Sequence, residues 1–141
     1  MLPLTTVFYR LGWAALLGSI IGAERTIRRR PAGMRTSVCV TVAAALFTIV
    51  SVEIAKASGD SSTTRIASNI VQGVGFLGAG VIMSRGDVII GVTTASVVWV
   101  LAAIGALIGA GEFAGAVTMA IVTVACLTVF DYLERWIQKH R

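Results

Sequence analysis

Residues 72–80 read Gln72-Gly-Val-Gly-Phe-Leu-Gly-Ala-Gly80 and place four glycines inside one apolar run, 66–84. That run has the roughly 20-residue length of a helix that crosses a 30 Å hydrocarbon core. An interior glycine costs about 1 kcal/mol of helix propensity relative to alanine. We therefore expect neighbouring backbones to approach closely and compensate for this cost.

The four glycines occupy two faces of the predicted helix. On a helical wheel, Gly73 and Gly80 lie close together, whereas Gly75 and Gly78 project to the opposite side. Small residues let membrane helices approach closely, so a helix thinned on two faces can be sandwiched between two neighbours. The sequence predicts that this glycine-rich third helix is central in a bundle, and that its glycines either pack or line a path.

The composition is that of an integral membrane protein. Hydrophobic residues make up 56% of the 141 residues and charged residues only 13%, with a mean hydropathy of +0.86, whereas soluble domains are about one quarter charged. Five apolar runs have the length of a transmembrane helix: 4–23, 36–55, 66–84, 92–109 and 113–130. The prediction is an all-α membrane protein, with a five-helix transmembrane domain over 1–130 and a short amphipathic cytoplasmic tail over 131–141.

The basic residues predict the orientation in the membrane. If the five helices alternate, nine of the twelve Lys and Arg residues share the side of the first loop, the third loop and the tail, and three lie opposite. Cytoplasmic loops carry the excess of Lys and Arg. The sequence therefore predicts that the amino terminus is outside and the carboxyl terminus cytoplasmic.

On that cytoplasmic side we expect one basic surface, which would suit phosphate, anionic lipid or an acidic partner. Its predicted members are Arg25, Arg28, Arg35, Arg85, Thr93 and Thr94. Glu24 lies four residues before Arg28 and can pair with it along a continued first helix, so a solvated ion pair is the simpler account. No aromatic interleaving accompanies the basic residues, so we expect no nucleic-acid partner.

Asn69 and Gln72 are the deepest strongly polar residues of the third run. The favoured interpretation is that these two amide side chains form hydrogen bonds between helices. The alternative is that they line a path for a solute. The acidic residues fall at the ends of the runs, whereas a cation carrier usually keeps a carboxylate at depth. Magnesium is usually held by one or two carboxylates and several waters. A single copy therefore lacks the expected metal site, although an oligomer could form a hydrated path.

Enzymatic activity is not expected. Gly73-x-Gly75-x-x-Gly78 matches the dinucleotide fingerprint, but that motif needs a strand before it and a helix start after it. The sequence shows no nucleophile with a base, no metal-ligand cluster and no carboxylate pair. We expect no catalytic residue and no cofactor.

The chain resembles the MgtC/SapB membrane proteins through three blocks, which span most of the first four predicted helices. They are Gly22-Ala-Glu24-Arg25 with Pro31-Ala-Gly33-Met-Arg35-Thr36, then Arg65-Ile66 with the run Gly73 to Gly80, and Gly91-Val-Thr93-Thr94-Ala95 with Trp99. The resemblance implies a multi-pass protein of the bacterial inner membrane, tied to magnesium homeostasis and, in some members, to survival inside host cells. It also implies magnesium dependence or sensing.

The resemblance leaves two functions open. Members look like regulators of other membrane machinery, such as an ATPase or a transporter, so the first expectation is a homo-oligomer that modulates such a partner. The alternative is an ion transporter or channel in its own right. Many members also carry a cytoplasmic carboxyl-terminal ligand-binding domain, and this chain is expected to represent the transmembrane domain without it.

Overall fold

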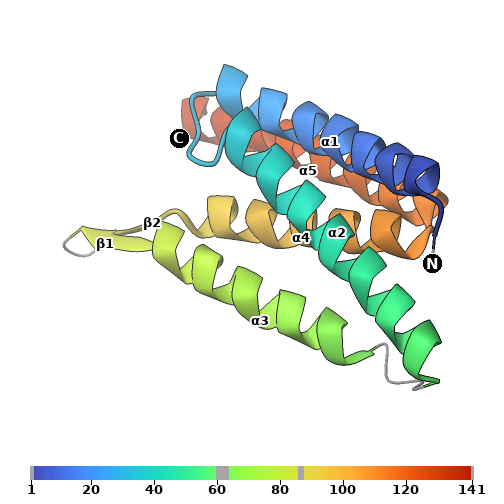
Figure 1. Cartoon of the computed structure of the whole chain (residues 1–141). Coiled ribbons are helices and arrows are strands. Elements are labelled where there is room, and N and C mark those ends of the chain that lie inside the picture. The colour runs from blue at the N-terminus through green and yellow to red at the C-terminus, as the bar shows by residue number, and fades with distance from the viewer. Residues whose placement is uncertain (1, 60–63, 86–87, 141) are drawn as a thin grey trace.

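The computed structural model describes residues 2–59, 64–85 and 88–140, except the side chains of 64–67 and 85. Within them the chain forms five helices and one short hairpin (Figure 1). The helices are α1 (Leu4–Ile27), α2 (Met34–Ser58), α3 (Thr64–Val81), α4 (Val92–Ala110) and α5 (Phe113–Lys139). Strands β1 (Met83–Arg85) and β2 (Val88–Ile90) are antiparallel, with Met83 opposite Ile90.

Four of these helices, α1, α2, α4 and α5, are long and apolar enough to cross a membrane. A mostly helical protein with four candidate membrane spans is therefore confirmed. The third helix is not among the four, because its 18 residues include an arginine, Asn69, Gln72 and four glycines. That α3 also crosses, and that the fold has five spans, stays a prediction.

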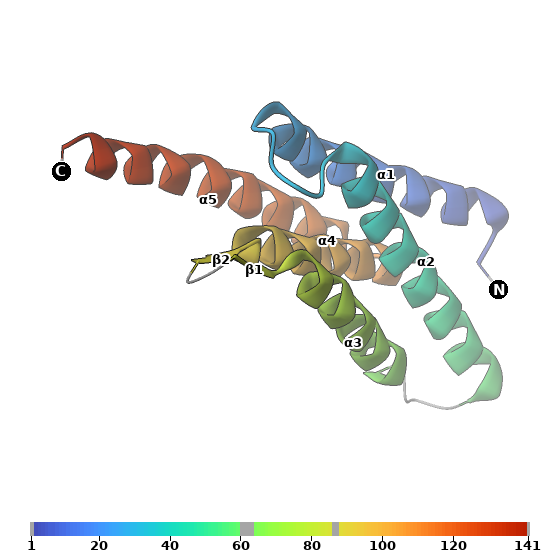
Figure 2. The same cartoon turned by 90° about the vertical axis from the view of Figure 1, so that its left-hand side faces the viewer.

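The central helix is α4, and the prediction that the glycine-rich α3 is central was wrong. Figures 1 and 2 show α4 running among the other helices, with α3 at the edge of the bundle. The physical reason is side-chain character. The α4 helix is apolar nearly all round, and its Leu101, Ile104 and Ile108 are completely buried. A helix that is hydrophobic on every face belongs in the interior.

Close helix packing comes from glycines outside the 72–80 run. A Cβ atom added at Gly18 of α1 would lie 2.8 Å from Oγ1 of Thr41, and one added at Gly105 of α4 would overlap the carbonyl oxygen of the same Thr41. A Cβ atom added at Gly109 would lie 2.5 Å from the carbonyl oxygen of Ala45. The α2 helix is thus held between α1 and α4 by backbone approach on two sides.

Three of the four glycines in the 72–80 run have open space beside them. Apart from the adjoining residues and the backbone of α3 itself, no atom of the described chain lies within 4 Å of a Cβ atom added at Gly73, Gly75 or Gly80, whereas one added at Gly78 would touch Cβ of Ala95 at 3.6 Å. Among the described residues of the single chain, only Gly78 of this run lies against another helix, and that the run packs or lines a path stays a prediction. The α3 helix leaves most of its small-residue surface uncovered.

One end of the bundle collects four segments: the end of α1, the start of α2, the hairpin, and the end of α5 (Figure 1). The α5 helix continues past the apolar run to Lys139 and extends beyond the other helices (Figure 2). At the same end, Gly91 has φ +93 and comes so close to the carbonyl oxygen of Val81 that a Cβ atom would clash. Glycine is therefore required where the hairpin returns the chain to α4.

Candidate functional site: a charged cavity

Arg25 is buried at the charged end of the bundle. Arg25 lies in the last turn of α1 and is only 3% exposed. Its Nη2 donates a hydrogen bond of 2.7 Å to Oγ1 of Thr94. Thr94 is itself buried, in the first turn of α4. The pair joins the end of one helix to the start of the central helix. A buried hydrogen bond to a charged group contributes about 1.5–3 kcal/mol.

Asp131 of α5 is the centre of a second set of contacts. Its carboxylate is paired with Arg28, lies 3.3 Å from Nη2 of Arg30 and lies 2.9 Å from Nε of Arg135. Arg28 also pairs through Nε with Oε1 of Glu24 at 2.7 Å. These ion pairs connect the end of α1 and the loop after it to α5. Because both carboxylates are less than one-fifth exposed, screening by solvent is only partial.

A cavity of about 710 Å³ opens among these groups; we call it the charged cavity. Its polar lining consists of Glu24, Arg25, Arg28, Arg30, Thr93, Thr94, Asp131 and Glu134. Apolar side chains, including Leu127 and Phe130, form another part of the wall. The cavity is also bounded by Gly80, at the end of the glycine run, and by Gly91. It combines fixed charges with an apolar wall at the end of a membrane bundle.

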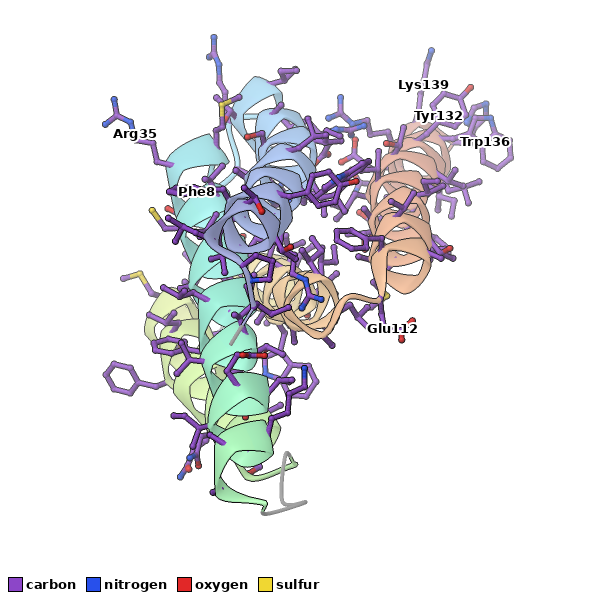
Figure 3. All side chains as sticks on the ribbon, turned by 45° about the vertical axis from the view of Figure 1, so that its right-hand side comes forward. Phe8, Arg35, Glu112, Tyr132, Trp136 and Lys139 are labelled. Carbon is purple, nitrogen blue, oxygen red and sulfur yellow. The ribbon has the colours of Figure 1, made fainter. Side chains whose placement is uncertain are left out.

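The charged cavity brings together part of the predicted basic surface and leaves part of it out. Glu24, Arg25, Arg28, Thr93 and Thr94 meet there. Arg35 and Thr36 are exposed near the start of α2 and do not line the cavity, and Figure 3 shows Arg35 pointing away from the bundle. The side chains of Arg65 and Arg85 lie outside the described part of the chain.

The remaining motif residues have mainly packing positions. A Cβ atom added at Gly22 would lie 2.6 Å from Cα of Met34, and one added at Gly33, before α2, would lie 2.7 Å from Oγ1 of Thr26. Trp99 is about half exposed. It borders a groove of about 620 Å³ between α2, α3 and α4.

The polar residues of α3 lie at its uncovered surface. Asn69 and Gln72 are both exposed. Asn69 and Gly73 line a groove of about 430 Å³ between α2 and α3, whose other walls are apolar. Within the described chain, no three His, Cys, Asp or Glu side chains come together in a group that could hold a metal ion.

Asp131, Arg30 and Arg135 are site residues that were not predicted from the sequence. Asp131 directly follows the fifth apolar run, on the side predicted to carry most of the positive charge. An acidic residue there could have been recognised as a partner for the arginines of the first loop. The hairpin was also missed, although two short runs separated by the two residues 86–87 are a hairpin signal.

The structure has four long apolar helices, with close packing at glycines and a charged cavity at one end. These features are those of a multi-pass helical membrane protein. The chain belongs to the MgtC family, whose model matches residues 11–136. No solved structure matches it.

Several curated proteins are similar to the chain. Protein MgtC of Brucella abortus is 45% identical over 136 residues, which cover 96% of this chain and 55% of that protein. Protein MgtC of Salmonella typhimurium is 44% identical over 116 residues, covering 82% of this chain and 48% of that protein. An uncharacterized protein of Haemophilus influenzae is 34% identical over 140 residues, covering 94% and 59%. The chain thus spans about half the length of the curated relatives it matches.

Proposed function

We propose that the protein resides in the bacterial inner membrane and modulates magnesium or other ion homeostasis by acting on a membrane partner, such as an ATPase or a transporter. Magnesium dependence or sensing belongs to the same proposal. Family membership supports the magnesium connection. The proposal assigns the chain no enzymatic activity.

The position and pairing of the carboxylates carry this proposal. Asp131 and Glu24 lie at the charged end and are held by arginines. Glu53, near the end of α2, lies 3.4 Å from Nζ of Lys56 and accepts a 2.7 Å hydrogen bond from the backbone N–H of Leu2. Between these ends, the core around Leu101 and Ile104 is apolar. A cation carrier usually keeps an acidic group at depth, so this arrangement favours a modulator.

The end of α5 offers a surface for lipid and for a partner. Tyr132, Leu133, Trp136 and Ile137 are exposed there, and Figure 3 shows Tyr132, Trp136 and Lys139 projecting from α5. Aromatic side chains beside basic ones suit the headgroup layer of a membrane. We assign this surface to anionic lipid at the cytoplasmic face.

We propose further that copies of the chain associate through α3. Asn69 and Gln72 are exposed, and Gly73 and Gly80 have open space beside them. An amide that faces lipid lacks a hydrogen-bond partner, which is costly in a hydrocarbon environment. A second α3 helix would supply both small-residue packing and amide partners. Close self-association explains why a helix of modest hydropathy carries four glycines.

The alternative function is an ion transporter or channel formed by the oligomer. The observation that favours it is the groove lined by Asn69 and Gly73, because two such grooves facing one another would place amides along a shared path. Discontinuous or glycine-rich helices line ion paths in some transporters.

The test combines ion flux with capture of a partner. Purified protein in liposomes that contain a magnesium-sensitive dye should give no flux above protein-free liposomes, whereas the tagged protein should retain a specific ATPase or transporter from native membranes. Magnesium flux through the purified protein alone would reject the modulator function and support the transporter function. Absence of both would reject both functions.

A matched pair of variants tests association through α3. Gly73→Leu should weaken cross-linking between copies while the helical signal in circular dichroism is retained. Gly12→Leu is the control, because Gly12 lies in α1 and also has open space beside it, so its cross-linking should be unchanged. Equal cross-linking in both variants would place the contact elsewhere.

A further inference from the structure

Arg25 has a buried donor that the described chain does not satisfy. Its Nη2 is bonded to Thr94, but Nε is buried and has no hydrogen-bond partner among the described residues. The ion pairs of the described carboxylates Glu24 and Asp131 are with other arginines, and the neighbouring Glu24 attracts Arg25 without a direct ion pair. Burying a guanidinium that has an unbonded donor and no direct ion pair is costly.

The position of Arg25 beside the start of α4 adds to this cost. A helix amino terminus carries partial positive charge and backbone N–H groups without intrahelical partners. No side chain caps α4, and Gly91, Thr93 and Thr94 border the charged cavity together with Arg25. A cation beside a positive helix end is electrostatically unfavourable, unless an anion binds between them. Helix amino termini of this kind are common sites for phosphate groups.

Glu24 lines the same cavity and has an unsatisfied acceptor. Its Oε1 is paired with Arg28, but Oε2 is buried and has no hydrogen-bond partner in the described chain. An ionised carboxylate only accepts hydrogen bonds. A ligand that satisfies both Arg25 and Glu24 must therefore carry an oxyanion and also an O–H or N–H donor. Phosphate near neutral pH meets this requirement, whereas sulfate carries no proton to donate.

We propose that the charged cavity binds a phosphate group that carries a hydrogen-bond donor. Arg25 and the amino terminus of α4 hold the phosphate oxygens, and Oε2 of Glu24 accepts from the donor. The other cavity charges, on Arg28, Arg30, Asp131 and Glu134, include ion pairs among themselves. The site is independent of whether the protein modulates a partner or moves ions.

Two sources supply this chemistry, and the cavity admits either. Free hydrogen phosphate carries its own O–H group. The headgroup of phosphatidylethanolamine carries a phosphate and an ammonium donor, and its acyl chains would extend along the apolar wall at Leu127 and Phe130. Phosphatidylcholine serves as the comparison lipid, because its headgroup carries the same phosphate but a quaternary ammonium group with no N–H or O–H donor for Glu24.

The experiment uses the purified full chain in detergent micelles after removal of native lipid. Equilibrium dialysis measures binding of radiolabelled inorganic phosphate, with sulfate as competitor. Native mass spectrometry measures which lipid is retained from nanodiscs of equal phosphatidylethanolamine and phosphatidylcholine. Saturable phosphate binding that survives a tenfold excess of sulfate supports the site with free phosphate as its source. Selective retention of phosphatidylethanolamine supports the site with the lipid headgroup as its source.

Three variants test whether the charged cavity is the place where phosphate binds. Arg25→Lys keeps the charge but loses the guanidinium donors, so affinity should fall by about tenfold or more, as expected for hydrogen bonds to charged groups. Glu24→Gln should abolish discrimination against sulfate, because an amide can donate to it. Arg29→Gln is the control, because Arg29 is exposed and outside the cavity lining, and it should bind like the unaltered protein.

Several results would overturn the proposal. The first is the absence of both saturable phosphate binding and lipid selectivity. The second is competition by sulfate as effective as that by unlabelled phosphate in the unaltered protein. The third is a loss of phosphate affinity in Arg29→Gln equal to that in Arg25→Lys. If Arg25→Lys does not fold, as judged by circular dichroism, the Glu24→Gln result decides. Retained discrimination against sulfate in that variant would reject the role of Glu24 and with it the site.

Discussion

Nη1 of Arg10 donates a 2.5 Å hydrogen bond to the carbonyl oxygen of Gly109, near the end of α4. Arg25, much later on the same α1 helix, donates to Thr94 at the start of α4. One helix thus bonds to both ends of the central helix. The Arg10 contact is also favourable because the carbonyl end of a helix attracts cations.

Replacing Arg10 by methionine should destabilise the bundle. The change removes the hydrogen bond to Gly109 and leaves a carbonyl group unsatisfied, so the free energy of unfolding should fall by about 1–3 kcal/mol. Reversible unfolding in mixed micelles, followed by circular dichroism, measures it. Lys139→Met, at the exposed end of α5 (Figure 3), is the control. An equal loss in the control would show that the Arg10 bond contributes nothing specific.

Gly105→Ala should be more damaging than Gly73→Ala. At Gly105 the new methyl group would overlap the carbonyl oxygen of Thr41 and lie 2.8 Å from Cβ of Ala44, so α2 and α4 must separate. Overpacking of this kind costs about 1–3 kcal/mol. At Gly73 the methyl group meets open space within one chain and adds up to about 1 kcal/mol of helix propensity, provided that the assay is run at a detergent excess that disperses the copies. The same unfolding assay compares the two, and the reverse order would contradict the assigned packing.

Asp131→Asn should release the end of α5 from α1. The substitution removes the negative charge that holds Arg28 and Arg30 across the gap between the helices. The distribution of distances between spin labels at Arg29 and Gln138 should therefore broaden. High salt should broaden the distribution of the parent protein in the same way, because the Debye length falls from about 10 Å at 0.1 M to about 3 Å at 1 M. Identical distributions in parent and variant would show that other contacts position α5.

The predicted orientation can be tested with single cysteines. In a background with Cys39 and Cys126 replaced by serine, a membrane-impermeant maleimide should label Lys56→Cys in intact cells. Lys139→Cys should react only after the cells are opened, because the basic end is predicted to be cytoplasmic. Both lysines are exposed. The opposite labelling pattern would reverse the topology.

Apolar run length predicted the helices well. The runs at 92–109 and 113–130 lie within α4 and α5, and the helices start at the same residues. The third helix ends earlier than expected, at Val81, because residues 83–85 pair with 88–90 as strands. Run length reports hydrophobic content, so it does not show where an apolar segment changes from helix to strand.

Neighbour relations were less predictable. A helical wheel shows that Gly73 and Gly75 thin two faces, but not which helix lies against either face. The glycine of α4 that packs against Thr41 is Gly105. The spacing of small residues alone does not distinguish such a packed glycine from one with open space beside it. At the site, the Glu24–Arg28 pair followed from spacing within one helix. The pairing with Asp131 depends on how α5 is aligned with α1, which local sequence does not specify.

The edge position of α3 has a consequence for biosynthesis. The ribosome completes α3 before α4, yet α3 is the helix that does not qualify as a span by length and composition, and its packing in the chain is mainly against α4. A segment of low hydrophobicity partitions poorly into lipid by itself. We expect the translocon to hold α3 until α4 emerges and then to release α3 and α4 into the membrane together, as a packed pair of helices.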